Sequence, residues 1–133
     1  MCWQCIAAGA NGLILYSWFD LWKKVNKVPF AVRWAECRRV GEEIQRYFPV
    51  LLSDEITPPK VSAGLFVRTW RKNGKIWMLV VNARDATNNA EILFDVDFAS
   101  VRSSFGPSAV KIAHGLKVSL GAYEPAMYIL SGK

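Results

Sequence analysis

The sequence is poor in the side chains from which most catalytic and metal-binding sites are built. It has one histidine, His114, and three cysteines, Cys2, Cys5 and Cys37. An odd number of cysteines does not form a disulfide framework, and Cys2 and Cys5 lack two further ligands nearby for zinc. We therefore predict no metal site and interpret all three cysteines as small buried apolar residues on helices. His114 stands beside Gly115 without a nucleophile motif, so we expect a surface or packing role for it.

Long apolar runs are also missing. No stretch approaches the roughly 18 apolar residues of a membrane span, so we predict no membrane partner. The first ten residues lack the basic start of a secretory signal, and glycines at positions 9 and 12 break the apolar segment early. We therefore expect a soluble chain, cytoplasmic if Met1 is a natural start. The compartment of any longer parent protein stays open.

Charge of one sign is not concentrated anywhere. The formal net charge is +6 and the pI is near 9.4, which would favour anionic partners if the charges were clustered. Instead, Arg33, Arg38, Arg39 and Arg46 alternate with glutamates on one predicted helix, so we predict no nucleic-acid partner. The glycines at positions 9 and 12 precede a predicted strand, whereas a phosphate-binding loop follows a strand and opens a helix. We predict no cofactor.

The first part of the chain has the pattern of alternating helix and strand. Small and apolar residues at helical spacing run to Ala8, and the continuous apolar run Leu13 to Trp18 is typical of a strand covered on both faces. A second helix is predicted from Pro29 to the residues before Pro49, where it ends. Its apolar face consists of Phe30, Trp34, Cys37, Val40, Ile44 and Tyr47.

A polar, proline-rich segment, Ser53 to Pro59, predicts a boundary between residues 1–52 and residues 60–133. Beyond it, Asn73 and Gly74 give the strongest short signal for a β-hairpin. Short strands separated by turn residues predict a small antiparallel β-sandwich. The predicted strands are Leu65 to Trp70, Ile76 to Asn82, Ala90 to Phe94, Val110 to Ala113, Leu116 to Leu120 and Tyr123 to Leu130.

The succession of these segments resembles the C-terminal part of a bacterial glycoside hydrolase. The resemblance lies in a small-residue helix, the strand GLILYSWFD, the helix PFAVRWAECRRVGEEIQ, the phrase FPVLLSDE, a hairpin around NGK and the final strand AYEPAMYIL. In such enzymes a (β/α)₈ barrel closes with its eighth strand and helix and runs into a C-terminal β-sandwich. The resemblance implies an α+β chain, with a helix-strand-helix remnant of an α/β barrel followed by a small antiparallel β-sandwich.

The resemblance also points to candidate substrate-binding residues. Barrel active sites lie at the C-terminal ends of the strands, which would bring Trp18, Phe19 and Asp20 to the sugar site. Trp18 would be a stacking platform for the sugar, because a flat indole meets the C–H groups of a sugar face with a large contact area. Alternatively, Trp18 is a packing residue at a strand end, and Asp20 caps the turn or lies in water. Trp34, Trp70 and Trp77 are expected in the core.

No catalytic pair is present in the chain. Glycoside hydrolysis usually needs two carboxyl groups across the scissile bond, roughly 5 to 10 Å apart, and neither the helical glutamates nor Glu124 forms such a pair. In barrel enzymes of this kind these groups usually come from earlier strands. We therefore expect a C-terminal portion that supplies a sugar-stacking wall and a supporting sandwich without being catalytic alone. Its partner would be carbohydrate if the barrel is completed. The alternative is a free-standing carbohydrate- or protein-binding module. Strand 13–18 would favour self-association if its sheet were incomplete.

Overall fold

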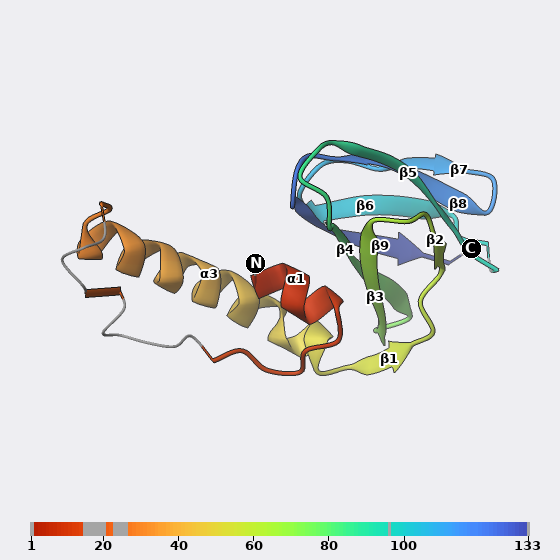
Figure 1. Ribbon diagram of the computed structural model, residues 1–133. Helices are drawn as coiled ribbons and strands as arrows, with labels where there is room; N and C mark the ends of the chain where they lie inside the picture. Colours follow the sequence, from red (N-terminus) through yellow and green to blue (C-terminus); the bar gives the residue numbers. More distant parts are fainter. Residues whose placement is uncertain (1, 15–20, 23–26, 96, 133) are drawn as a thin grey trace.

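The protein forms three layers, a helical layer and two antiparallel sheets (Figure 1). The computed structural model describes residues 2–14, 21–22, 27–95 and 97–132. The helical layer contains α1 (Cys2–Ala7) and α3 (Phe30–Leu51). The five-stranded sheet has the spatial order β1 (Asp54–Ile56), β3 (Leu65–Lys72), β4 (Lys75–Asn82), β9 (Pro125–Ser131) and β6 (Ser100–Phe105). The four-stranded sheet has the order β2 (Lys60–Val61), β5 (Asn88–Leu93), β8 (Gly115–Leu120) and β7 (Val110–Ile112).

The predicted mixture of helices with an antiparallel β-sandwich is confirmed. All neighbouring strands pair antiparallel. The hairpin between β3 and β4 turns at Asn73 and Gly74, with Lys72 opposite Lys75. Both turn residues have positive φ angles, 51° and 70°, which match the right-handed twist of the flanking strands in a two-residue hairpin loop. None of the described helices is long and apolar enough to cross a membrane.

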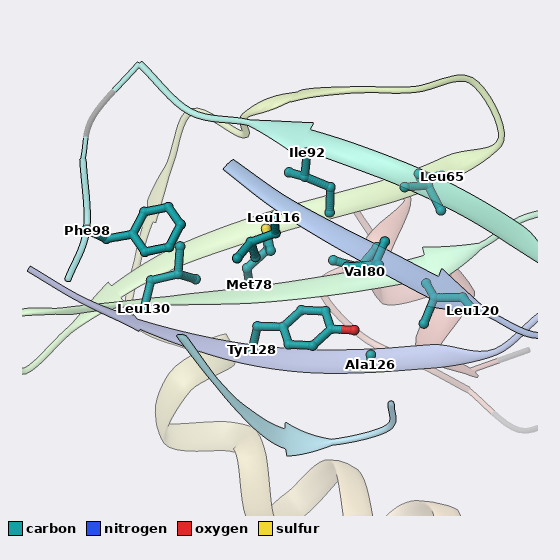
Figure 2. Packing of buried hydrophobic residues seen from close by; sticks show 12 residues of the cluster. Leu65, Met78, Val80, Ile92, Phe98, Leu116, Leu120, Ala126, Tyr128 and Leu130 are labelled. Carbon is teal, nitrogen blue, oxygen red and sulfur yellow. The ribbon is translucent and has the colours of Figure 1, made fainter. Parts of the chain in front are cut away.

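An inter-sheet core fills the space between the two sheets (Figure 2). Alternate residues of β4 and β9, such as Met78 and Tyr128, point toward Ile92 and Leu116 of the four-stranded sheet. This alternation follows from the two-residue period of a β-strand. The inter-sheet core consists of Leu65, Met78, Val80, Ala90, Ile92, Phe98, Leu116, Val118, Leu120, Ala126, Tyr128 and Leu130.

A second core lies on the opposite face of the five-stranded sheet, against α1 and α3. In β4, Leu79 and Val81 belong to this core, while Met78 and Val80 belong to the first. The central strands are thus buried on both faces, which explains why residues 76–81 of β4 are all apolar. The residues of this helix-facing core are Trp3, Ile6, Ala7, Tyr47, Val50, Trp70, Leu79, Val81 and Met127. The helix-facing core therefore contains residues from both sides of the predicted boundary.

The boundary segment itself contains a strand. Residues 54–56 form β1, which pairs with β3 and places Glu55 opposite Trp70. Three strands were not predicted, β1, β2 and β6. The first two have three residues or fewer. All three lie at sheet edges, where polar side chains can remain in water, so the sequence shows no regular alternation of apolar and polar residues.

The expectation that Pro49 ends the helix was wrong, because α3 continues to Leu51. The fixed φ angle of proline is a helical angle, so the ring removes one hydrogen bond near the end of the helix without stopping the last turn. Val50, one residue later, is buried in the helix-facing core. That burial offsets the missing bond.

Two other expectations were wrong, both for side chains on helices. Cys5 is exposed, although Cys2 and Cys37 are half-buried. Trp34 is 37% exposed on α3, whereas Trp70 is fully buried and Trp77 packs against the helix-facing core. Helical periodicity identifies an apolar face but does not say whether another element covers it. Of the two roles expected for His114, surface or packing, the structure shows the surface one, because the side chain is exposed.

The predicted strand 13–18 is described only at its start. Leu13 and Ile14 lie in no strand, and Ile14 is almost fully exposed. Residues 15–18 lie outside the described residues. The barrel-strand interpretation of this segment therefore stays a prediction.

Candidate functional site

The predicted substrate-binding residues, Trp18, Phe19 and Asp20, lie outside the described residues. The structure describes the segments on both sides of them. These segments line two hollows beside α3 and form a clamp built around a buried arginine. Among the described residues, no group of three or more His, Cys, Asp or Glu side chains could hold a metal ion.

Arg68 is the most densely bonded side chain of the described chain. It lies on β3 and is 9% exposed. Its Nε donates to Oε1 of Glu55 at 2.9 Å, and its Nη2 donates to Oε2 of Glu55 at 2.7 Å. The same guanidinium donates from Nη1 to the carbonyl oxygens of Ile6 (3.3 Å) and Ala10 (3.0 Å) and from Nη2 to Oδ1 of Asn11 (2.7 Å). This Arg68 clamp joins the end of α1 to two strands of the sheet.

The Arg68 clamp is structural rather than an anion-binding site. Guanidinium has five N–H donors, and these five hydrogen bonds use all of them. The hydrogen bonds from Arg68 hold the pKa of Glu55 below its usual range, while partial burial acts in the opposite direction. Glu55 is therefore a carboxylate at neutral pH. An anionic ligand would have to displace it.

The larger hollow is a groove between α1 and α3, with a volume of about 450 Å³. Its lining is mostly apolar and includes Ile6, Leu13, Val40, Ile44, Phe48 and Leu51. The groove lies beside the point where the chain leaves the Arg68 clamp toward residue 18. Because every donor of Arg68 is used, the groove suits an apolar occupant.

The second hollow, of about 410 Å³, holds carboxylates on α3. Arg39 donates to Oε2 of Glu36 at 2.9 Å and to Oε2 of Glu43 at 3.0 Å, and Trp3 Nε1 donates to Oε1 of Glu43 at 3.0 Å. The hydrogen bonds from Arg39 lower the pKa of Glu36. A general acid needs a raised pKa to carry its proton at neutral pH, so Glu36 is suited to an ion pair and not to proton donation.

The tryptophans of the sandwich do not offer a sugar platform. Trp70 is fully buried and forms part of the helix-facing core, with the Arg68 guanidinium carbon 5.3 Å from its ring centre. Trp77 packs against the same core. The outward positions of the four-stranded sheet carry Asn89, Glu91 and Lys117, none of them aromatic.

No protein-family model matches the chain, and no curated protein is similar to it.

The Arg68 clamp was not predicted from the sequence. Its partners Ile6 and Asn11 precede Arg68 by 62 and 57 residues, and two of the five acceptors are backbone carbonyls, which have no sequence signature. The one available signal was an arginine at an inward position of an apolar strand, which needs partners when buried.

Proposed function

We propose that the chain is the C-terminal portion of a glycoside hydrolase and supplies one wall of a sugar site together with a sandwich that supports a barrel. The observation that carries the proposal is the Arg68 clamp. It fixes the chain at Ala10 and Asn11, only a few residues before the segment in which the resemblance places a barrel strand. A stacking platform at Trp18 needs a preceding segment that is held in place, because binding groups are effective only when they are fixed in position.

The helical layer supports the same proposal. Tyr47 and Val50 of α3 are buried against the sheet, Ile44 packs at the edge of the same core, and Phe48 extends the apolar surface of the helix along the groove. A helix of a two-layer protein needs an apolar stripe of only about 100°. Apolar surface on two sides of one helix is typical of a helix between two layers, as the helices of a barrel would be between its strands and the sandwich.

The free-standing module is the less favoured function. A carbohydrate-binding sandwich needs aromatic rings on an open sheet face. Its best candidates, Trp70 and Trp77, belong to or pack against the helix-facing core.

The test begins with the genomic reading frame upstream of the Met1 codon. An open frame of roughly 250 codons, with glutamates at two predicted strand ends, is expected for a barrel enzyme. The longer protein would then be assayed with a panel of aryl glycosides beside the 133-residue chain. We expect turnover by the longer protein only.

The role of Trp18 is tested in the same longer protein. Trp18→Ala should raise KM for the aryl glycoside more than it lowers kcat, because a stacking platform mainly binds substrate. Trp22→Ala is the matched control, since Trp22 is exposed and has no expected role. A stop codon directly upstream of Met1, or hydrolysis by the 133-residue chain itself, would contradict the proposal.

A further inference from the structure

The five-stranded sheet has a cationic face at the end where β3 and β4 join. The register sets residues of four strands in two rows across the sheet, and residues directly opposite one another share a side of it. The first row contains Trp70, Trp77, Ile129 and Arg102, and the second contains Lys72, Lys75, Ser131 and Ser100. None of the eight is acidic. The cationic face consists of Lys72, Lys75, Ser100, Arg102 and Ser131.

Both rows lie on the helix-facing side of the sheet. In the first row, the ring centre of Trp77 lies 6.5 Å from that of Tyr47 on α3. In the second row, Lys72 donates from Nζ to the carbonyl oxygen of Pro49, near the end of the same helix. The cationic face therefore adjoins the C-terminal end of α3.

The charges of the cationic face are not neutralised within the chain. Lys75 and Arg102 are exposed, and neither has a hydrogen bond or an ion pair in the described part of the chain. Val101 packs against the inter-sheet core, so Arg102, the next residue of the strand, points to the helix-facing side. Lys72 donates to a carbonyl oxygen and not to a carboxylate. Three positive charges thus lie on one side of the sheet.

The arrangement of these charges suits an extended anion. Neighbouring strands lie about 4.8 Å apart, so Lys72 and Arg102, which are three strands apart, are separated by about 14 Å in the direction across the strands. None of the residues of the cationic face lines either hollow beside α3. A small ion would stay in open water there, whereas a chain with repeated negative charges meets several cations at once.

The other side chains of the two rows favour an acidic polysaccharide among such chains. Trp77 is half-buried and Ile129 is buried, so the rows offer no exposed ring for stacking nucleic-acid bases and no apolar side chain for a bilayer. Protein interfaces usually have an apolar centre and few lysines. Ser100 and Ser131 lie opposite each other beside Arg102, and serine hydroxyls both donate and accept hydrogen bonds, as sugar hydroxyls do. A guanidinium binds a carboxylate through two parallel hydrogen bonds.

We propose that the cationic face binds a polysaccharide whose sugars carry carboxylates, which contact Arg102 and Lys75 while neighbouring sugar hydroxyls contact the two serines. The inference rests on the proposed function for the class of partner, carbohydrate, and narrows that class to acidic sugars. The sequence did not reveal this face, because Lys75 and Arg102 are 27 residues apart. The proposed function is decided by turnover in the longer protein, whereas this inference is decided by binding to the 133-residue chain, so the two can fail separately.

The test is binding of fluorescently labelled polygalacturonate to the 133-residue chain at low salt, measured by fluorescence anisotropy. Arg102→Gln and Lys75→Gln should each weaken binding about fivefold, and the double variant more than either, because each removes a charge that only the ligand neutralises. Arg38→Gln is the matched control, since Arg38 is exposed on α3, outside the two rows and without an ion pair in the described ranges. It should leave the affinity unchanged within about twofold.

Three further probes separate the cationic face from general stickiness. Neutral dextran should not bind, and a single-stranded oligothymidylate and anionic lipid vesicles should each bind about fivefold more weakly than polygalacturonate. Circular dichroism checks that each variant is folded. The proposal is overturned if polygalacturonate does not bind, if dextran binds equally well, or if both single variants behave like Arg38→Gln. Tighter binding of the oligonucleotide or of the vesicles overturns it as well, because the partner would then be of another class.

Discussion

Arg68 and Glu55 form a two-point ion pair across β3 and β1, with N–O distances of 2.9 and 2.7 Å. The pair is asymmetric in its surroundings. The side chain of Arg68 is 10% exposed, whereas that of Glu55 is 50% exposed. Of the bonds that Arg68 donates, only the one to the Ile6 carbonyl oxygen is fully buried, whereas those to Glu55, Ala10 and Asn11 are partly buried.

Replacing Arg68 by lysine should destabilise the fold by about 2–4 kcal/mol, because carbonyl and amide acceptors at Ile6, Ala10 and Asn11 lose donors at roughly 1–3 kcal/mol each. Urea denaturation followed by tryptophan fluorescence measures the change. Arg71→Lys, on the exposed face of the same strand, should change the free energy of unfolding by less than about 0.5 kcal/mol. Equal effects of the two substitutions would contradict the role of the clamp.

The loss of folding stability at low pH should depend on Glu55. Its pKa is lower in the folded state than its ordinary value of 4.5, so the unfolded chain takes up the proton first as the pH falls. Its contribution is therefore complete above about pH 4.5 and disappears as the pH falls through the folded pKa. Glu55→Gln should lower the free energy of unfolding by about 1–2 kcal/mol at neutral pH, with the difference shrinking in acid.

The control for that measurement is Glu91→Gln. Glu91 pairs with Lys117 at 3.1 Å, and both side chains are more than half exposed. Exposed pairs contribute little, so this substitution should change stability by less than about 0.5 kcal/mol at any pH. A pH-independent effect of Glu55→Gln would show that its charge is not involved.

Tyr128 should make the fold sensitive to alkali. Its ring is fully buried in the inter-sheet core, and its hydroxyl has no hydrogen-bond partner among the described residues. Burial, and then the charge of Glu124, raise the pKa of Tyr128 to about 12. The unfolded chain loses this proton near pH 10, so stability is full below pH 10 and falls between pH 10 and 12, by about 2–3 kcal/mol in all.

Tyr128→Phe should remove that alkaline loss and leave stability at neutral pH unchanged or raised by about 1 kcal/mol, since it deletes an unpaired buried hydroxyl. Denaturation curves at neutral pH and at pH 11 measure both effects. A phenylalanine variant that is clearly less stable at neutral pH would mean that the hydroxyl is hydrogen-bonded in solution.

Gly106 and Gly74 should respond differently to alanine. Both have positive φ angles, 77° and 70°, so alanine is strained at either position. A Cβ at Gly106 would also lie 2.7 Å from the Pro125 carbonyl oxygen and from the Ala126 Cβ, whereas nothing lies within 4 Å at Gly74. Gly106→Ala should therefore be less stable than Gly74→Ala by about 1–3 kcal/mol in thermal unfolding.

Removing residues 1–52 should expose the helix-facing side of the sheet. The inter-sheet core stays intact, but Trp70, Leu79 and Met127 lose their cover. We expect the remaining chain to keep its β-sheet circular dichroism while it binds a hydrophobic dye and aggregates. A truncated chain that stays monodisperse and binds no dye would show that the helical layer is dispensable.

The sequence predicted those parts of the fold that local patterns determine. The hairpin at Asn73 and Gly74 has the expected register, and α1 ends before the glycine at position 9, which has a φ angle of 103°. Edge strands such as β6 were missed because Arg102 and its serine neighbours show no regular alternation. Pairing partners, not local propensity, decide whether such residues form a strand.

The candidate site was less predictable than the fold. The sequence-predicted residues Trp18, Phe19 and Asp20 stay a prediction. The Arg68 clamp depends on contacts over 62 residues of chain with Ile6, which no spacing rule reveals. The exposure of Trp34 shows the same limit, because an apolar stripe is identical in sequence whether its partner lies in the same chain or in another molecule.

The burial of the five-stranded sheet on both faces sets an order of events during synthesis. Trp3 packs with Tyr47 and Phe105, and its side of the sheet also needs Met127 of the last strand. At roughly 5–20 residues per second, the ribosome makes α1 several seconds before β9, whereas a helix forms in about a microsecond. The helical layer is thus made first and covered last. For those seconds Trp3 and the apolar side of α1 are exposed on the nascent chain. A chaperone that holds unfolded chains would bind there.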